Sequence, residues 1–208
     1  MELFTADAIA GFDKRYRANF INSITGFKSV ALIGTTHPNG MHNLAIFSQI
    51  IHVGANPPLI GILFRPHTVA RHTLENIHET GFFTINHITQ EFVVEAHHTS
   101  ARWESSEFKA CGLTPHINDS LPAPYVQEAT LRIGCKFEEK LFVEANQTEF
   151  VIGQIQEVHL PHDFVSEDGF VDLELAGTLC ASGLDSYHKT KKVGRYAYAK
   201  PDKVPEKI

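Results

Sequence analysis

The chain has 208 residues and a mass of 23.2 kDa, which is enough for one domain, or at most two small ones, with a sizeable buried core. Hydrophobic residues make up 43% of the chain and charged residues 20%, and the 14 glycines and 10 prolines are scattered. This composition excludes disorder, collagen and a coiled coil. The net charge of −6 argues against a general nucleic-acid binder held by phosphate neutralisation.

The charge is unevenly distributed along the chain. Residues 189–208 hold seven Lys and Arg residues and two acidic residues, a net charge of +5, which leaves −11 on residues 1–188. Such a basic C-terminal segment is most often a solvated tail, and otherwise a clamp for an anion or for a partner subunit.

Cysteine usage and the N-terminal segment indicate a cytoplasmic protein. Cys111, Cys135 and Cys180 are widely spaced without a CxxC pair, so neither a disulfide framework nor a thiolate zinc site is expected. The first residues lack a basic region followed by an apolar run, so they do not resemble a signal peptide. Residues 29–64 contain no charged side chain, but turn residues divide them into runs too short to cross a bilayer as helices.

Hydrophobic periodicity and turn residues predict many strands and a few short helices in one domain over residues 1–208. In chain order we expect a helix at 12–24, strands at 29–35, 41–49 and 59–64, a helix from Thr68 to Gly81, a strand at 82–86, short helices within 89–98 and 106–110, a loop at 115–124, and long strands at 131–143 and 150–159. The predicted fold class is therefore mainly β, as a closed or half-closed barrel.

The segment before the second long helix is unusually rich in cations. Thr68 is a suitable N-cap, and Arg65 and Arg71 then lie near the positive end of the helix dipole, where cations are mildly unfavourable. Glu75, the nearest acid, comes one turn later. A bound phosphate would remove this conflict, although both arginines could instead extend into water or pair with distant carboxylates. No dinucleotide or P-loop glycine motif occurs, so a single terminal phosphate is the easier fit.

The predicted strand at 41–49 carries polar side chains in an otherwise apolar setting, namely His42, Asn43, Ser48 and Gln49. Buried amides and hydroxyls need partners. They either satisfy neighbouring backbone groups or face a ligand with hydrogen-bonding edges, and the sequence alone leaves both possibilities open.

Other catalytic or metal chemistry is weakly supported. The chain has 13 histidines, but neither HExxH nor another convincing two-histidine motif is present, so no metal is expected. No GxSxG motif occurs, and no cysteine has a recognisable nucleophile context. No catalytic residue can be named from the sequence.

An ordered set of segments makes the chain similar to a known family. The segments are RANFI at 17–21, VALIGTTHPNGMHNLAIFSQI at 30–50, NPPLI at 56–60, the run from Arg65 to Asn76, GFFTIN at 81–86 and GLDSY at 183–187. Over about residues 13–201 the chain resembles the flavin reductase-like family with the FMN-binding split barrel.

The resemblance implies a homodimer that holds FMN at the subunit interface. It places the flavin ring along the strand that contains Asn43, Leu44, Ala45 and Ser48. It places the phosphate at Arg65, Thr68, Arg71, Thr73 and Asn76, the segment that the dipole argument had selected. It implies small-molecule electron donors and acceptors, and no membrane or nucleic-acid partner.

The family includes NAD(P)H:flavin reductases, which pass hydride from nicotinamide C4 to flavin N5, and flavoredoxin-like electron carriers. A reductase needs stacking geometry and water exclusion more than acid–base residues, which agrees with the absence of such a motif. The expected function is an NAD(P)H-dependent flavin reductase, and the alternative is an FMN electron carrier without NAD(P)H activity. A flavin-free interaction protein would have lost the phosphate contacts. Residues 183–201 depart from the Gly-Gly-x-Tyr-Tyr type of sequence expected of monooxygenase reductases.

Overall fold

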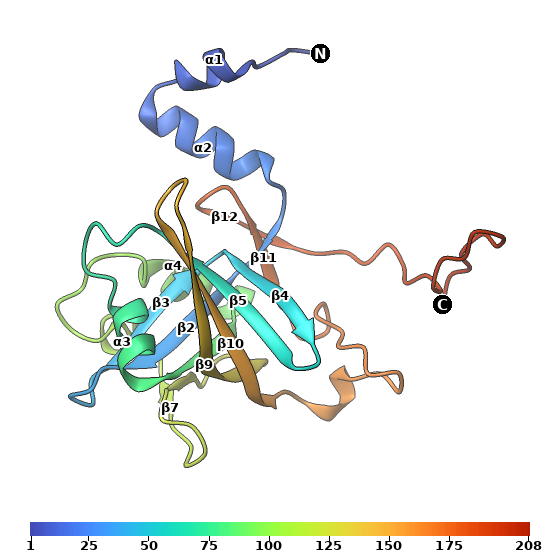
Figure 1. Ribbon diagram of the computed structural model, residues 1–208. Helices are drawn as coiled ribbons and strands as arrows, with labels where there is room; N and C mark the ends of the chain where they lie inside the picture. Colours follow the sequence, from blue (N-terminus) through green and yellow to red (C-terminus); the bar gives the residue numbers. More distant parts are fainter.

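The computed structural model describes residues 1–208 and is built around one antiparallel sheet of seven strands (Figure 1). In spatial order the strands are β3 (His42–Phe47), β2 (Ala31–Thr36), β6 (Phe82–His87), β9 (Arg132–Val143), β10 (Thr148–His159), β5 (Pro58–Phe64) and β4 (Ile50–Ala55). The edge strands β3 and β4 follow one another in the chain, joined by Ser48 and Gln49, but they are not hydrogen-bonded to each other. The sheet therefore forms a barrel that stays open along this seam.

Two smaller sheets and several short helices complete the fold. A three-stranded sheet contains β1 (Lys28–Ser29), β11 (Leu179–Ser182) and β12 (Ser186–Lys189), and a two-stranded sheet contains β7 (Pro115–His116) and β8 (Tyr125–Val126). The helices are α1 (Ala6–Ala10), α2 (Lys14–Ile24), α3 (His72–Thr80), α4 (Val93–His98) and α5 (Glu107–Cys111), with 3-10 turns η1 (Gln90–Phe92) and η2 (His162–Phe164).

The sheet separates two hydrophobic cores, because alternate residues of a strand point to opposite faces. On β2, Ile33 belongs to an inner core that β4, β5, β6, β9, β10 and α3 surround. Leu32 belongs to an outer core, which η1, α4, α5 and the segment 113–129 cover. We call these the inner and outer faces of the sheet.

The outer covering segment lies so close to the sheet that two strand positions admit only glycine. A Cβ on Gly34 would lie 2.1 Å from the carbonyl oxygen of Pro124, and a Cβ on Gly134 would lie 2.2 Å from the hydroxyl of Tyr125. Both contacts are far shorter than van der Waals distance. The segment around β8 is therefore fixed on the outer face of β2 and β9.

The prediction of a mainly β chain with a few short helices is confirmed, but two local predictions were wrong. Thr68 does not cap the second long helix, because the backbone stays irregular until Arg71 and α3 begins at His72. The expected C-terminal glycine is correct, since Gly81 has a φ of 78° and its N–H bonds the carbonyl of Ile77. The strand predicted at 41–49 ends at Phe47, and β4 follows it, a strand that the sequence reasoning missed.

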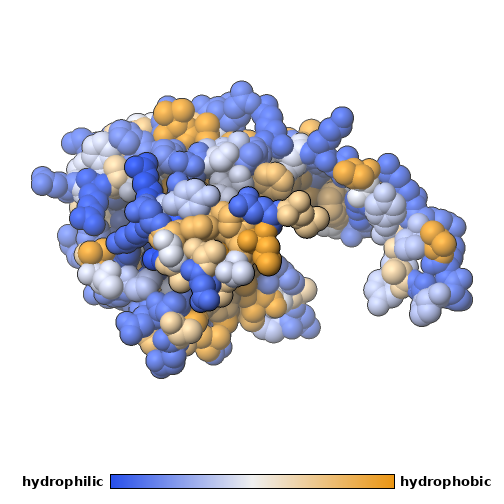
Figure 2. Space-filling model, turned by 90° about the horizontal axis from the view of Figure 1, so that it is seen from above, coloured by the Kyte–Doolittle hydropathy of each residue, from blue (hydrophilic) through white to orange (hydrophobic).

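Both ends of the chain extend away from the barrel (Figure 1). The N-terminal arm, which we define as residues 1–27 with α1 and α2, contains no buried residue. The C-terminal segment is anchored at its root, where Lys192 contacts Asp172 at 2.6 Å and Arg195 pairs with Asp168. Seen from above, hydrophobic side chains gather near the middle of the face and the C-terminal segment projects to one side (Figure 2). No helix has the length and apolarity needed to cross a membrane.

Candidate functional site

The candidate site begins at the loop between β5 and α3, where the sequence predicted a phosphate. Arg71 occupies the N-cap position of α3 and provides no side-chain cap. Glu75 folds back instead: its Oε1 accepts the backbone N–H of Arg71 at 3.0 Å and lies 2.8 Å from Nε2 of His67. The hydrogen bond from the Arg71 backbone is the main reason that the pKa of Glu75 lies below its ordinary value. Glu75 thus relieves part of the charge conflict that the sequence indicated.

The arginines of this loop have no acidic partner. Arg65 is exposed, and neither Arg65 nor Arg71 takes part in an ion pair, so the predicted alternative of distant carboxylate partners is not found. Nε of Arg71 is buried without a hydrogen-bond partner, and Nη2 makes only a long bond of 3.4 Å to the carbonyl of Pro66. Thr68 is exposed in the same loop. The loop therefore presents two cations and a hydroxyl that the protein itself does not satisfy.

Three of the predicted ligand residues meet in a buried polar network between β2, β3 and α3. Nδ2 of Asn43 donates to Oγ1 of Thr73 at 3.0 Å and to Oγ1 of Thr35 at 3.2 Å. Nδ2 of Asn76 also donates to Thr35, at 3.0 Å. All four side chains are buried, and Oδ1 of Asn76 is left without a partner. The network ties the α3 loop to the edge strand β3.

The remaining predicted residues lie on or next to β3. Asn43 and Ala45 share the inner face, whereas Leu44 points into the outer core and is fully buried, so its side chain cannot line a ligand site. The backbone N–H of Leu44 donates to Oε2 of Glu107 at 3.0 Å. Ala45 and Ser48 are half-buried, and Ser48 lies at the seam between β3 and β4.

Sequence reasoning missed two residues of this region. The hydroxyl of Thr35 accepts hydrogen bonds from both Asn43 and Asn76, but in the sequence Thr35 is indistinguishable from an ordinary strand threonine. Glu107 accepts a hydrogen bond from the backbone N–H of Leu44 on the edge strand β3, 63 positions earlier in the chain. No local sequence pattern indicates such a contact. Its neighbour Ser106 has a buried hydroxyl oxygen without a partner.

A second polar cluster lies on the outer face, around Glu157 of β10. The carboxylate accepts hydrogen bonds from Asn118 at 2.7 Å, Ser120 at 2.5 Å and Tyr125 at 2.5 Å, and Nε2 of His159 lies 3.0 Å away. Burial opposes the charge, but the four hydrogen bonds together lower the pKa of Glu157 to about 2. All four side chains that contact Glu157 find this hydrogen-bond partner within the protein, which indicates a structural role for the cluster.

A cavity of about 460 Å³ opens at the mouth of the barrel, between β1, β4, β5 and β11. Most of its lining is apolar, and it includes His87 on β6, whose Nδ1 lies 3.1 Å from Oγ1 of Thr178. Burial lowers the pKa of His87 to about 4. This histidine is therefore neutral at physiological pH.

Comparison with known proteins settles the family. A family model described as the flavin reductase like domain matches residues 25–174. The chain belongs to the flavin reductase-like family. This assignment confirms the resemblance inferred from the ordered segments.

The similar proteins also confirm the fold as a split barrel. A crystal structure of a Shewanella frigidimarina protein with a split barrel domain is 46% identical, with a TM-score of 0.92 over 96% of this chain and 100% of that one. An uncharacterised protein of Halalkalibacterium halodurans is 30% identical over 71% of this chain and 74% of its own length. Flavoredoxin of Desulfovibrio vulgaris is 22% identical, with a TM-score of 0.68 over 85% of this chain and 91% of that one, and shows likeness of fold alone.

The family implies a flavin, and the residues of the candidate site fit the ribityl phosphate chain of a flavin mononucleotide. Arg71 offers an unpartnered N–H and Arg65 an unpaired guanidinium, both of which suit phosphate oxygens. Asn76 offers an unpartnered buried acceptor, which suits a ribityl hydroxyl. The N-terminus of α3 has no side-chain cap, so its first N–H groups are also free to bind an anion.

Proposed function

We propose that this flavin reductase-like protein binds FMN and works as an NAD(P)H-dependent flavin reductase, with residues 1–208 as one functional domain. The observation that carries the proposal is the loop before α3, where Arg71, with a buried Nε that has no partner, occupies a helix N-terminus without a side-chain cap, and Arg65 comes earlier in the same loop without an acidic partner. A buried guanidinium N–H without a partner is costly unless an anion binds it.

Each part of the site has a distinct task in this proposal. Arg65, Thr68 and Arg71 bind the phosphate of FMN. Thr73 and Asn76, in the first turns of α3, orient the ribityl chain that carries this phosphate. Glu75 holds the loop in place through the backbone of Arg71, since its carboxylate is already engaged there. Ala45 and Ser48 border the place of the flavin ring at the open seam of the barrel, beside Asn43 and the backbone of Leu44.

Bound flavin would supply the redox chemistry, as an acceptor of hydride and a donor of electrons. The chain contributes position and environment. The buried Asn43 network fixes α3 against β3, so phosphate and ring are held by two elements that cannot move independently. Glu75 is ionised at neutral pH because its pKa is lowered, so it is a hydrogen-bond acceptor in the site and not a proton donor.

The alternative function is a flavoredoxin-like electron carrier without NAD(P)H activity. The sequence at 183–201 departs from the pattern expected of monooxygenase reductases, which argues against that subgroup and keeps this alternative open. Part of that segment forms β12, and the rest belongs to the C-terminal extension. Both functions require the same phosphate site and differ in whether nicotinamide reaches the flavin.

Two experiments test the binding of the cofactor and the reaction separately. Purified protein is titrated with FMN and with riboflavin, which lacks the phosphate, and binding is followed by flavin fluorescence. We expect FMN to bind at least tenfold more tightly, whereas equal affinity would refute the phosphate site. The FMN-loaded protein is then mixed with NADH or NADPH under anaerobic conditions. Rapid bleaching of the flavin absorption supports the reductase, and bleaching by dithionite alone supports the carrier.

We further propose that the protein is a homodimer in which the N-terminal arm of one subunit covers the other. Several apolar side chains of the arm are exposed, including Tyr16 at 54%, Ile24 at 62% and Phe27 at 70%. Phe12 packs its ring on Tyr16 and Phe20 with centroid separations of 4.7 and 5.5 Å, so the arm is ordered by its own aromatic contacts. The helix α2 is amphipathic and contributes no residue to either hydrophobic core of its own chain. An ordered helix with such an uncovered apolar side is typical of a subunit interface.

Sedimentation velocity at micromolar concentration tests the dimer. Wild type is expected to sediment as a dimer, and Ile24→Asp as a monomer, because the substitution puts a charge into the interface. Val94→Asp is the matched control, since Val94 is 74% exposed on α4 and lies outside the arm. A monomeric wild type would refute the proposal. The compartment we propose is the cytoplasm, where the three free thiols would stay reduced.

A further inference from the structure

Arg132 is half-buried and carries a positive charge that no acidic side chain of the protein pairs with. It is the first residue of β9 and lies between Asn86 of β6 and His159 of β10 in the sheet register. Its Nε and Nη1 atoms are buried and have no hydrogen-bond partner. No carboxylate comes within 4.0 Å of its guanidinium. Burying such a group without a partner is costly, so a partner from outside the chain is expected.

The acid that could have paired with Arg132 is already engaged. Glu157, two residues before His159 on β10, accepts bonds from Asn118, Ser120 and Tyr125, and His159 approaches the same Oε1 atom. Three of these contacts reach Oε1 and one reaches Oε2, and neither oxygen lies within 4.0 Å of the Arg132 guanidinium. Arg132 is therefore left without an acidic partner in its own chain.

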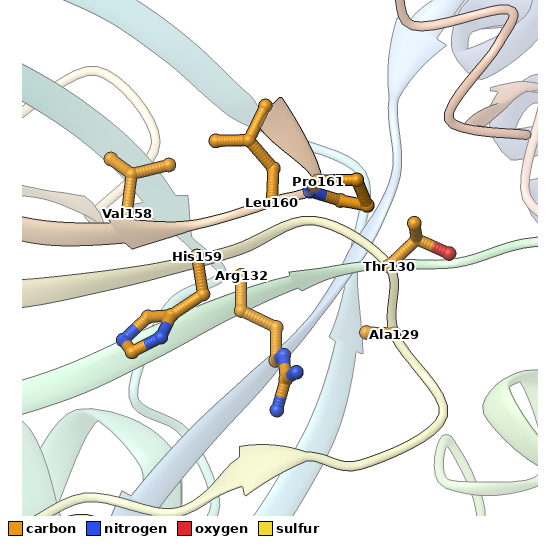
Figure 3. Close-up of a pocket in the computed structure, with 7 residues that line it drawn as sticks. All are labelled: Ala129, Thr130, Arg132, Val158, His159, Leu160 and Pro161. Atoms are coloured by element: carbon orange, nitrogen blue, oxygen red, sulfur yellow. The ribbon is translucent and has the colours of Figure 1, made fainter. Parts of the chain in front are cut away.

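The guanidinium belongs to an open pocket of about 540 Å³. In Figure 3 the side chains of Arg132 and His159 extend to the same side of the strands, whereas Val158 and Leu160 project the opposite way. The lining residues are Ala129, Thr130, Arg132, Val158, His159, Leu160 and Pro161. On one side of the strands the pocket offers the cation of Arg132 and the imidazole of His159, and its volume has room for more than an inorganic ion.

This pocket is separate from the proposed FMN site. Arg132 shares the outer face of the sheet with Leu32 and Ile46, whereas the Asn43 network lies on the inner face. Across the sheet, three strand spacings separate β9 from β3, which is about 14 Å. One ligand group cannot contact Arg132 and Arg71 through the sheet.

We propose that Arg132 binds the oxyanion of a small organic acid, a carboxylate or a phosphate ester, whose uncharged part occupies the rest of the pocket. The planar guanidinium offers two N–H groups side by side, which matches two oxygens of either anion. His159 would stay bonded to Glu157 and form one wall of the site. This inference does not depend on the proposed flavin chemistry.

Calorimetric titration with three probes tests the site. The probes are benzoate, phenyl phosphate and benzamide, and the last is a neutral control of the same shape. The protein is saturated with FMN beforehand, so that phenyl phosphate cannot occupy the site at Arg71; if FMN does not bind, the untreated protein is used with Arg71→Ala as a further variant. The decisive variant is Arg132→Gln, and Arg102→Gln, at an exposed arginine, is the matched control.

We expect at least one anion to bind wild type and the Arg102→Gln variant equally, and to bind Arg132→Gln at least tenfold more weakly, with no binding of benzamide. The anion that binds more tightly distinguishes carboxylate from phosphate ligands. Anion affinity that survives in Arg132→Gln, equal loss in the control, or no anion binding at millimolar concentration would overturn the proposal. The melting temperature supplies a second criterion: without ligand, Arg132→Gln should melt at or above wild type, whereas a clear decrease would show that Arg132 has a structural partner.

Discussion

The two polar clusters of this protein, one on each face of the sheet, differ in how completely they are satisfied. On the outer face, the carboxylate of Glu157 has four partners, and its buried neighbour Tyr125 is bonded to it. On the inner face, Asn43 donates to Thr73 of α3 and to Thr35 of β2, yet Asn76 keeps a free oxygen and Arg71 a free Nε. Both clusters contain buried polar groups, so burial alone does not distinguish structure from function. The clusters differ instead in the number of buried polar atoms that lack a hydrogen-bond partner.

This difference follows from the cost of burying polar groups. In a network whose polar groups all have partners, the hydrogen bonds offset the desolvation cost within the folded chain and stabilise it. A network with unpartnered groups forms its missing hydrogen bonds only when a ligand binds. The outer cluster should therefore affect stability and not FMN affinity. The cluster around α3 should affect FMN affinity more than the stability of the flavin-free protein.

The largest effect is expected for Glu157→Gln. The substituted amide would present two donors to a site built from donors, and would leave the Tyr125 hydroxyl poorly satisfied. We expect the free energy of unfolding at pH 7 to fall by about 2–4 kcal/mol, measured by urea denaturation. Glu138→Gln, at an exposed position of β9, should be neutral. An unchanged stability, or a large loss of FMN affinity, would break the distinction between the clusters.

The next effect is that of Arg71→Ala on FMN binding. Loss of a charge-assisted bond of about 1.5–3 kcal/mol should weaken FMN binding by roughly ten- to a hundredfold. The flavin-free variant should be as stable as wild type or slightly more so, because a cation near a helix N-terminus has been removed. Melting temperatures with and without FMN measure both quantities. A destabilised flavin-free variant with normal FMN affinity would make Arg71 a structural residue.

Thr73→Val tests whether the inner network serves both structure and ligand. Its hydroxyl oxygen accepts from Asn43, and its hydrogen stays available to a phosphate. We expect a loss of about 0.5–1.5 kcal/mol in unfolding free energy and a decrease of about two- to tenfold in FMN affinity. If stability falls and FMN titrations match wild type, Thr73 is not a ligand residue.

The smallest effect is a pH dependence that arises from Glu157. Its folded pKa of about 2 lies below the ordinary value of 4.5, so its stabilising contribution is complete above pH 4.5 and is lost as the pH falls toward 2. Between pH 7 and pH 4 this loss is about 1 kcal/mol. Wild type and Glu157→Gln should therefore converge in stability as the pH decreases. A constant difference across this range in urea denaturation would contradict the assignment.

Local chemistry in the sequence was enough to locate part of the candidate site. The two arginines and Thr68 stand within seven positions of one another, next to a proline and a helix, so their closeness along the chain is visible without the tertiary structure. The start of α3 was misjudged, because Thr68 suits an N-cap by residue type while Glu75 determines the actual loop conformation. That contact crosses only one turn, yet residue preferences alone do not reveal it.

Hydrophobic periodicity and turn residues determined that this chain forms a mainly β fold of the closed or half-closed barrel type, because each strand must bury its own faces whatever its neighbours are. That the barrel stays open between β3 and β4 was decided by the tertiary structure. The tertiary structure decided which polar atoms find partners. Asn43 meets Thr73 across 30 positions and Glu157 meets Asn118 across 39, while Arg132 meets no acid at all. Such pairings depend on which strands become neighbours. A hydrogen bond requires atoms within about 3 Å, and only the folded backbone sets distances on that scale.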